Sequence, residues 1–195
     1  MENLKKLLSE ESHYRPSEAV MDLFLSKMTE VRLKNKEALI PYGKLDTNVY
    51  ILKEGIVRML YHEGENERTH AFALPGTMLL SWHSYYMRYP AFMQLEACTD
   101  STLMKISKKE FDDLIESSPE FAQWILSISM IQLYTYERRL SVISGSAKER
   151  FIGLIKDRPI LMEKVSQGII ASYLGITQSY LSSLKKQLLY KDTEK

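Results

Sequence analysis

The chain has 195 residues, of which 45% are hydrophobic, and its 26 basic and 25 acidic residues give a net charge of +1. This length and composition allow one or two folded domains and argue against intrinsic disorder. No run approaches the roughly 18 apolar residues of a membrane span, and the N-terminal MENLKKLLSEESHYRP lacks the apolar stretch of a signal peptide, so we expect a cytoplasmic protein.

The first 28 residues are predicted to be helical. Ser17, which follows Pro16, is a plausible N-cap. Apolar residues then recur at helical spacing and form one stripe: Val20, Leu23, Phe24 and Met28.

From about Val31 the hydrophobic period becomes that of strands. Segments such as NVYILKEGIVRMLY, RTHAFAL and FMQLEACTDSTLMKIS are separated by the turn-like clusters YGKLDTN, HEGENE and LPGT. Short strands without long helices between them predict an antiparallel sandwich or small barrel over about residues 31–107. Cys98, the only cysteine, is expected to be a small buried residue, and a single cysteine excludes an internal disulfide or a Cys-rich metal site.

After a short helix in SKKEFDDLIESSPE and a break at Pro119, a long helix is predicted from Phe121 to about Ser144. Its apolar residues form two adjacent stripes, the first with Phe121, Ile125, Ile128, Thr135 and Val142, the second with Trp124, Ile131 and Tyr134. One stripe can pack on the sheet domain while the other pairs with a second chain, so we predict a parallel homodimer. The alternative is that both stripes are buried within one subunit. Gly145 makes the segment 144–147 a candidate hinge.

Residues 171–188 read ASYLGITQSYLSSLKKQL and predict two short helices that meet at a corner. Gly175 can end the first helix in the left-handed conformation, and Thr177 is a good N-cap for the second. Apolar residues recur at helical spacing on both sides of the break: Ile169, Ile170, Tyr173, Leu174, Leu181, Leu184 and Leu188. This is the pattern of a helix-turn-helix, whose second helix is presented to DNA.

Charge supports this interpretation. Residues 147–195 carry 9 Lys and Arg against 5 Asp and Glu, a net charge of +4, whereas residues 1–146 have a net charge of −3. A basic C-terminal segment suits a DNA-facing surface, although a mildly basic solvated surface would have the same composition.

Together these segments resemble the Crp/Fnr superfamily of transcription regulators. The resemblance rests on YILKEGIVRML, LPGTM, the long helix, and AKERFIGLIKDRPILMEKVSQGIIASYLGITQSYLSSLKKQL. In particular it resembles the short branch common in Bacteroidetes-like genomes, whose chain stops just after the recognition helix, so no wing is expected from the final LYKDTEK.

The resemblance implies an α+β fold with an antiparallel β-roll, a double-stranded β-helix with flanking helices, over residues 1–118. A long dimerisation helix and hinge would follow over 119–146, and a helix-turn-helix DNA-binding domain over 147–195. It implies a homodimeric regulator that binds double-stranded DNA, with RNA polymerase as a further partner. No cofactor is expected.

The β-roll departs from the members that bind cyclic AMP. Their Gly-Glu pair, which holds the ribose, corresponds here to Leu80-Ser81, and their Arg-Ser-Ala, which holds the phosphate, corresponds to Ala91-Phe92-Met93. A buried phosphate needs a guanidinium or equivalent donors, so we expect no response to cyclic AMP. Arg88 is the nearest substitute for the missing arginine.

The same region is rich in aromatic residues: Trp82, Tyr85, Tyr86, Tyr89 and Phe92. Either they line a pocket for an unknown, flatter or more apolar effector, or they fill the former pocket and leave a dimer scaffold. The candidate effector residues are Leu80, Ser81, Trp82, Arg88, Ala91, Phe92, Tyr136 and Glu137. An effector at the junction with the long helix would act by rotating the DNA-binding domains about the segment near Gly145.

The resemblance places the base-reading positions on Gln178, Ser179, Ser182 and Ser183. Relatives usually have Glu and Arg where this chain has Ser179 and Ser183, so the bidentate Arg-to-guanine contact is missing and direct readout should be modest. Six residues are candidates for phosphate contacts: Ser166, Gln167, Thr177, Tyr180, Lys185 and Lys186. For the two lysines, an ordinary solvated helix end is the alternative.

Two other classes of function compete. The four histidines are scattered without metal-binding spacing and no Gly-rich phosphate loop is present, so we expect no enzyme and no metal site. The missing Arg and wing favour the second alternative, an effector-sensing or protein-interaction module that has lost DNA binding.

Overall fold

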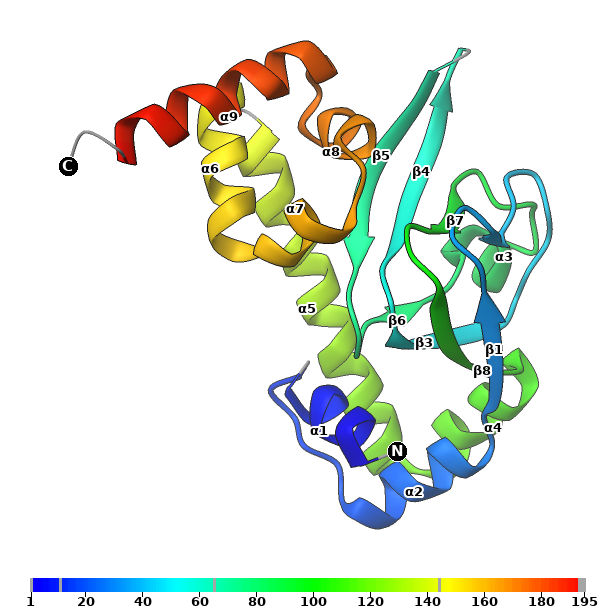
Figure 1. Ribbon diagram of the computed structural model, residues 1–195. Helices are drawn as coiled ribbons and strands as arrows, with labels where there is room; N and C mark the ends of the chain where they lie inside the picture. The colour runs from blue at the N-terminus through cyan, green and yellow to red at the C-terminus, as the bar shows by residue number, and fades with distance from the viewer. Residues whose placement is uncertain (1, 11, 65, 144, 193–195) are drawn as a thin grey trace.

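The structure, a computed structural model, describes residues 2–10, 12–64, 66–143 and 145–192 (Figure 1). Its strands form two antiparallel sheets, with helices before and after them, which confirms the predicted α+β fold. Ser144 and residues 193–195, on which part of the hinge prediction and the end of LYKDTEK fall, lie outside the described residues. Within the described part, no helix is both long and apolar enough to cross a membrane.

The N-terminal region forms two helices, α1 (Glu2–Glu10) and α2 (Glu18–Ser26), where one helical region was predicted. Ser17 occupies the N-cap position of α2, but its side chain makes no capping hydrogen bond. Its hydroxyl instead donates to the Glu120 carboxylate at 3.0 Å, which ties α2 to the long helix. Phe24 and Met28 are buried as predicted, whereas Leu23 is exposed.

Eight strands build the β-roll among the described residues: β1 (Thr29–Leu33), β2 (Ala38–Ile40), β3 (Val49–Glu54), β4 (Val57–Glu63), β5 (Asn66–Ala73), β6 (Met78–Leu79), β7 (Gln94–Ala97) and β8 (Ser101–Ile106). One sheet has the order β1-β8-β3-β6 and the other β2-β7-β4-β5. The short helix α3 (Trp82–Met87) lies between β6 and β7. Because β5 is an edge strand, one side of its backbone has no strand partner.

Alternating apolar residues of the two sheets meet in a core that includes Leu52, Leu95 and Leu103. Cys98 is buried as predicted, and burial raises the pKa of its thiol to about 12, so the thiol stays protonated.

A second core lies below the sheets, where α1 and α2 pack against α4 (Lys108–Ser117) and the long helix α5 (Pro119–Ile143). The rings of Phe24, Phe121 and Trp124 pack against one another with centroids 5.2 to 5.8 Å apart. In Figure 1, α5 runs from this core to the C-terminal helices and so connects the two ends of the molecule.

Both predicted stripes of α5 have buried residues, and each also has an exposed one, Thr135 in the first and Tyr134 in the second. Trp124 of the second stripe is fully buried beside Phe121 and Ile125 of the first, so residues of both stripes join the core beneath the sheets. The large apolar residues of α5 that are exposed include Tyr134 of the second stripe and three residues of neither stripe. We call them the apolar face of α5: Leu126, Met130, Leu133 and Tyr134, each 57 to 64% exposed.

Four helices follow: α6 (Ala147–Asp157), α7 (Pro159–Lys164), α8 (Gln167–Leu174) and α9 (Gln178–Asp192). Ser146 and Glu149 form a capping box that starts α6. The inner residues of these helices share one hydrophobic cluster with Ile56, Phe72 and Cys98 of the β-roll. In this structure the C-terminal helices are therefore docked on the β-roll and do not extend from α5 alone.

Candidate functional site

Helices α8 and α9 meet at the corner that the sequence predicted, and we call this pair of helices the helix-turn-helix. Gly175 ends α8 with φ 66°, and its N–H and that of Ile176 donate to the carbonyls of Ser172 and Ala171. Thr177 caps α9, because its hydroxyl accepts a hydrogen bond from the Tyr180 N–H at 3.2 Å. The predicted stop and start are both confirmed as local structure.

The two faces of α9 differ sharply. Leu181 and Leu184 are 0% and 2% exposed and anchor the helix in the cluster shared with α6 and α8. The ten candidate residues for DNA binding lie towards solvent. Two of them, Ser182 and Lys185, are half-buried, and the other eight are exposed: Ser166, Gln167, Thr177, Gln178, Ser179, Tyr180, Ser183 and Lys186. The structure therefore brings all ten candidate DNA-binding residues onto the outer surface formed by α8 and α9.

Two serine hydroxyls of α9 form hydrogen bonds to backbone carbonyls of the same helix. The Ser182 hydroxyl donates to the Gln178 carbonyl at 3.1 Å, and the Ser183 hydroxyl donates to the Ser179 carbonyl at 3.2 Å. Their hydroxyls then face outward mainly as acceptors. Lys185 and Lys186 form no ion pair with any carboxylate of the described residues, so both charges can meet an anionic partner.

A small set of polar contacts docks α8 on the edge of the β-roll. The Ser172 hydroxyl accepts a hydrogen bond from the Thr69 N–H at 2.9 Å and donates one to the Glu67 carbonyl at 3.0 Å. Arg158 donates to the Phe72 carbonyl at 2.9 Å, and the Phe72 ring lies 5.0 Å from that of Tyr173. The C-terminal helices, through Ser172 of α8 and Arg158 between α6 and α7, thus satisfy backbone groups of edge strand β5.

Arg139, near the end of α5, contacts the same junction. Its guanidinium lies 4.0 Å from the centroid of the Tyr173 ring and 3.5 Å from the Tyr173 carbonyl, to which it donates. Burial lowers the pKa of Arg139, as does the nearby charge of Arg158, and its buried Nε has no hydrogen-bond partner among the described residues. This guanidinium is held mainly by a ring and one carbonyl.

His70 and Tyr136 stack beside Arg139, with ring centroids 5.5 Å apart. Burial lowers the pKa of His70, and the charge of Arg139 adds to this effect, so the imidazole is neutral at pH 7. The Tyr136 hydroxyl contacts the Met59 sulfur at 3.7 Å.

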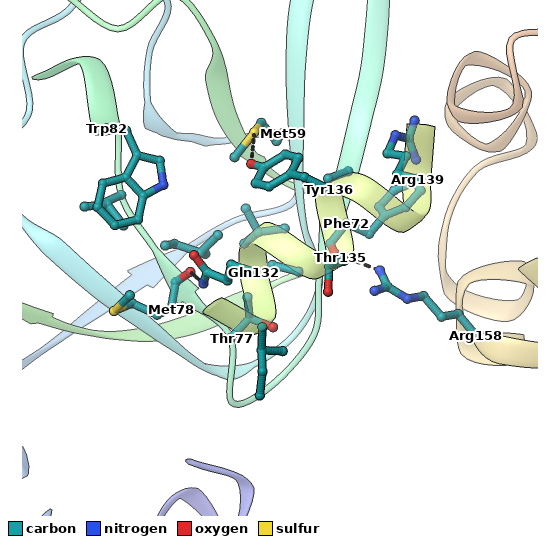
Figure 2. Close-up of a pocket in the computed structure, with 16 residues that line it drawn as sticks. Met59, Phe72, Thr77, Met78, Trp82, Gln132, Thr135, Tyr136, Arg139 and Arg158 are labelled. Atoms are coloured by element: carbon teal, nitrogen blue, oxygen red, sulfur yellow. Dashed lines mark hydrogen bonds between the residues drawn. The ribbon is translucent and has the colours of Figure 1, made fainter. Parts of the chain in front are cut away.

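A pocket of about 150 Å³, which we call the junction pocket, lies between the β-roll and α5 (Figure 2). Its walls come from β4, β5, the segment around β6, and α5, and the C-terminal helices contribute Arg158. Figure 2 shows Trp82 towards one end, Arg139 and Arg158 towards the other, and Tyr136 pointing to Met59 between them. Gln132 is fixed across the wall by a hydrogen bond of 2.9 Å from its amide to the Met78 carbonyl.

A second pocket of about 210 Å³, which we call the side pocket, shares Met59, Leu80, Trp82 and Tyr136 with the first. It extends towards residues 91–93, where cyclic-AMP-binding relatives are expected to hold the phosphate. It is lined by Ser81, His83, Phe92, Met93 and Leu95 besides the shared residues, and no arginine or lysine is among them. A phosphate at this side would find no cationic partner in the lining.

The structure groups the candidate effector residues only in part. Leu80, Ser81, Trp82, Phe92 and Tyr136 line one or both pockets. The remaining candidates, Arg88, Ala91 and Glu137, line neither of them.

Each of these three has a physical reason to lie elsewhere. Arg88 ends α3 in the left-handed conformation, with φ 58°, and is exposed. Ala91 is buried in the core between the sheets, and Glu137 faces solvent.

Of the five aromatic residues of this region, Trp82 lines both pockets and Phe92 lines the side pocket. Tyr85 is buried in the core beneath the sheets, where Lys108 lies 3.7 Å from its ring centroid. Tyr86, Tyr89 and Phe92 are 55 to 69% exposed, and Tyr86 stacks on Trp82 at the surface.

Sequence reasoning missed the residues that join the pocket to the helix-turn-helix, namely Phe72, Arg139 and Arg158. They come from three distant segments, so no local spacing connects them. The sequence holds one signal for the two arginines: neither Arg139 nor Arg158 has an Asp or Glu three or four residues away that could pair with it on a helix. Within the described residues, no group of three or more His, Cys, Asp or Glu could hold a metal ion.

Comparison with known proteins finds one matching family model and several solved structures of similar fold. Residues 30–118 match the family described as the cyclic nucleotide-binding domain. FixK2 from Bradyrhizobium japonicum is similar with a TM-score of 0.71 and 19% identity, over 85% of this chain and 86% of that chain. The c-di-GMP-responsive global regulator CLP of Xanthomonas campestris is similar with a TM-score of 0.72 and 16% identity, over 90% of this chain and 93% of that chain.

The catabolite activator protein of Thermus thermophilus is also similar, with a TM-score of 0.56 and 20% identity, over 90% of this chain and 85% of that chain. No curated protein matches the sequence. At these identities the structural likeness shows the shared fold.

Proposed function

From a chain that contains a cyclic nucleotide-binding domain and has the fold of the Crp/Fnr regulators, we propose a homodimeric, DNA-binding transcription regulator. Its helix-turn-helix binds double-stranded DNA, and a small molecule in the junction pocket, not cyclic AMP, controls it. RNA polymerase is the further partner that the family resemblance suggests. The role is regulatory and not catalytic.

The observation that carries the proposal is the two-faced helix α9. Its leucines are buried, its outer face presents Gln178 with the hydroxyls of several serines, and Lys185 and Lys186 extend from the same helix. Gln can form a bidentate pair with adenine, and lysines bind phosphates without reading sequence. This arrangement supports DNA binding with modest direct readout.

The apolar face of α5 supports the homodimer. Leu126, Met130 and Leu133 recur at intervals of four and three residues, which is the spacing of a coiled-coil seam. Each of them is more than half exposed, and such a stripe on a monomer would leave apolar area in water. Pairing two α5 helices would bury it and place two α9 helices for two half-sites about 34 Å apart.

The lining of the side pocket supports the absence of a cyclic AMP response. Ala91, at the position of the family's arginine, is 2% exposed and lies in the sheet core. Arg88 does not line either pocket, so it does not substitute.

Capture of genomic fragments by the purified protein, followed by footprinting, tests DNA binding. We expect two protected half-sites one helical turn apart and an affinity that falls with salt, with a log-log slope of about −5 if each subunit neutralises about three phosphates. Protein that is dimeric but retains no DNA even at low salt would contradict the proposal.

The second candidate is an effector-sensing or protein-interaction module that has lost DNA binding. The observation in its favour is that the hydroxyls of Ser182 and Ser183 donate hydrogen bonds to carbonyls of their own helix. This leaves α9 few side-chain donors that are free to bond to DNA bases. Failure of DNA capture by a ligand-binding dimer would select this candidate.

A further inference from the structure

The charge of the junction pocket is unbalanced. Arg139 and Arg158 both line it, and no aspartate or glutamate is among its lining residues. Neither arginine forms an ion pair within the described part of the chain. The rest of the lining is mostly apolar, with residues such as Val57, Phe72 and Leu79.

Arg139 is also short of hydrogen-bond partners. Its buried Nε has no hydrogen-bond partner among the described residues. The hydrogen bond from its Nη2 to the Tyr173 carbonyl is 3.5 Å long. A buried donor without a partner costs about 1–3 kcal/mol, more when it is charged. An acceptor with a negative charge placed beside this guanidinium would remove that cost.

The volume of the junction pocket and the charges around it limit the kind of ligand that it can hold. A cavity of about 150 Å³ is below the roughly 300–1,000 Å³ of sites for drug-sized ligands, and a cavity of that size can hold a benzene-sized molecule. The side pocket, where a cyclic nucleotide would place its phosphate, is lined by no arginine or lysine. The charged end of a ligand therefore belongs at the opposite end, beside the two arginines.

We propose that the junction pocket binds a small carboxylate with an apolar body, with the carboxylate at Arg139 and Arg158 and the apolar part directed towards Tyr136 and Trp82. This inference rests on the proposed regulatory function and deepens it by naming the ligand class. It also assigns the route by which the ligand reaches the helix-turn-helix.

The route follows from what the two arginines already touch. Arg158 belongs to the C-terminal helices and donates to the Phe72 carbonyl of β5, while Arg139 of α5 lies over Tyr173 of α8. Two like charges on opposite sides of the domain junction repel each other. A carboxylate between them neutralises this repulsion and connects α5 to the C-terminal helices, so the ligand favours the docked arrangement.

Binding is tested with two pairs of probes, octanoate against 1-octanol and phenylacetate against 2-phenylethanol, by isothermal titration calorimetry on the full chain. We expect at least one carboxylate to bind about tenfold or more tightly than its neutral partner, because charge-assisted hydrogen bonds are the stronger ones. Equal affinity within both pairs, or no binding of any probe, would overturn the inference.

Three variants locate the carboxylate. Arg139→Gln and Arg158→Gln should each reduce the carboxylate-to-alcohol preference towards one, and Arg139→Lys should retain part of it. Arg88→Gln, which removes an exposed arginine near the former phosphate side, is the matched control and should leave the preference unchanged. The preference is a ratio, so it stays interpretable if a variant lowers stability. Loss of preference in Arg88→Gln alone would overturn the assignment.

Hydrogen exchange at the Thr69 amide tests the route, since that N–H is bonded to Ser172 of α8. The bound carboxylate should slow this exchange about tenfold, and faster exchange would contradict stabilisation of the docked arrangement. DNA capture is measured on the same protein. A chain that binds the carboxylate but no DNA disproves only the proposed function, and one that binds DNA but no carboxylate disproves only this inference.

Discussion

The guanidinium of Arg139 lies 4.0 Å from the centroid of the Tyr173 ring, and this contact joins the long helix to the first helix of the helix-turn-helix. Arg139 also lines the junction pocket. One side chain therefore contacts a candidate ligand site and a candidate DNA-binding unit, and several predictions depend on how firmly the two are joined.

Ser172→Ala should loosen the docking of α8. The hydroxyl serves both the Thr69 N–H and the Glu67 carbonyl, and loss of one partner of a hydrogen bond costs about 1 kcal/mol or more. Exchange at the Thr69 amide should become several-fold faster by mass spectrometry or NMR. Ser183→Ala, whose hydroxyl donates only to the Ser179 carbonyl of its own helix, is the control and should leave Thr69 unaffected.

Two glycines test the corner of the helix-turn-helix. Gly175 has φ 66° with no atom within 4 Å of an added Cβ, so Gly175→Ala should lower the free energy of unfolding by about 1–2 kcal/mol through backbone strain alone. Gly153 lies within α6, also with open space around it, and Gly153→Ala should raise the free energy of unfolding by about 0.5–1 kcal/mol. Urea unfolding measures both, and the same sign for both variants would refute the explanation.

Leu133→Glu should convert the dimer to a monomer. It places a charge in the apolar face of α5, where the side chain is 64% exposed in one protomer. Light scattering after gel filtration should show half the mass of the unmodified protein. Leu45→Glu changes a leucine that is 56% exposed on the β-roll and should leave the mass of the dimer intact.

Lys186→Ala and Gln178→Ala should weaken DNA binding in different ways. Loss of the lysine from both subunits should reduce the steepness of the salt dependence by about 2, because about 0.9 is lost per phosphate. Loss of the glutamine should cost about 1–3 kcal/mol and relax the preference at one base pair of each half-site. Fluorescence anisotropy on a captured site measures both, and Lys44→Ala, an exposed lysine of the β-roll, should do neither.

Stability should fall on mild acidification because of His70. Burial and the charge of Arg139 lower its pKa in the folded chain, whereas the unfolded chain titrates near 6.5. Above about pH 7 both states are neutral and the contribution to stability is complete. As the pH falls below about 6.5 the unfolded chain takes up the proton first, so this contribution is lost, with a slope of at most about 1.4 kcal/mol per pH unit.

His70→Gln should therefore flatten the pH dependence of urea unfolding between pH 7 and 5.5, while His13→Gln, at an exposed position, should keep it. An unchanged slope in His70→Gln would show that other groups cause the loss.

The local parts of this structure could be predicted from the sequence. Gly175 and Thr177 work through their immediate neighbours, so their roles in ending α8 and starting α9 follow from residue type and position. The alternation of apolar residues likewise predicted the strands. The family resemblance supplied the topology, which no local pattern contains.

The faces of α5 could not be assigned from the sequence. Apolar residues lie on several sides of this helix, and the packing of α1, α2, α4 and the sheet decides that Trp124 is inside and Met130 outside. The junction pocket could not be predicted from the sequence for a related reason. Arg158 meets β5, and Arg139 meets Tyr173, only after the C-terminal helices have docked, which is a long-range event that spacing does not encode.

The position of β5 at the margin of its sheet has one more consequence. A strand with an open side is a template on which another chain can add a strand, and such templates promote aggregation. Here the hydroxyl of Ser172 and the guanidinium of Arg158 occupy that open side, so the C-terminal helices also act as a protective cover. A fragment cut off before α6 would lose this cover, and the β-roll on its own would be prone to self-association.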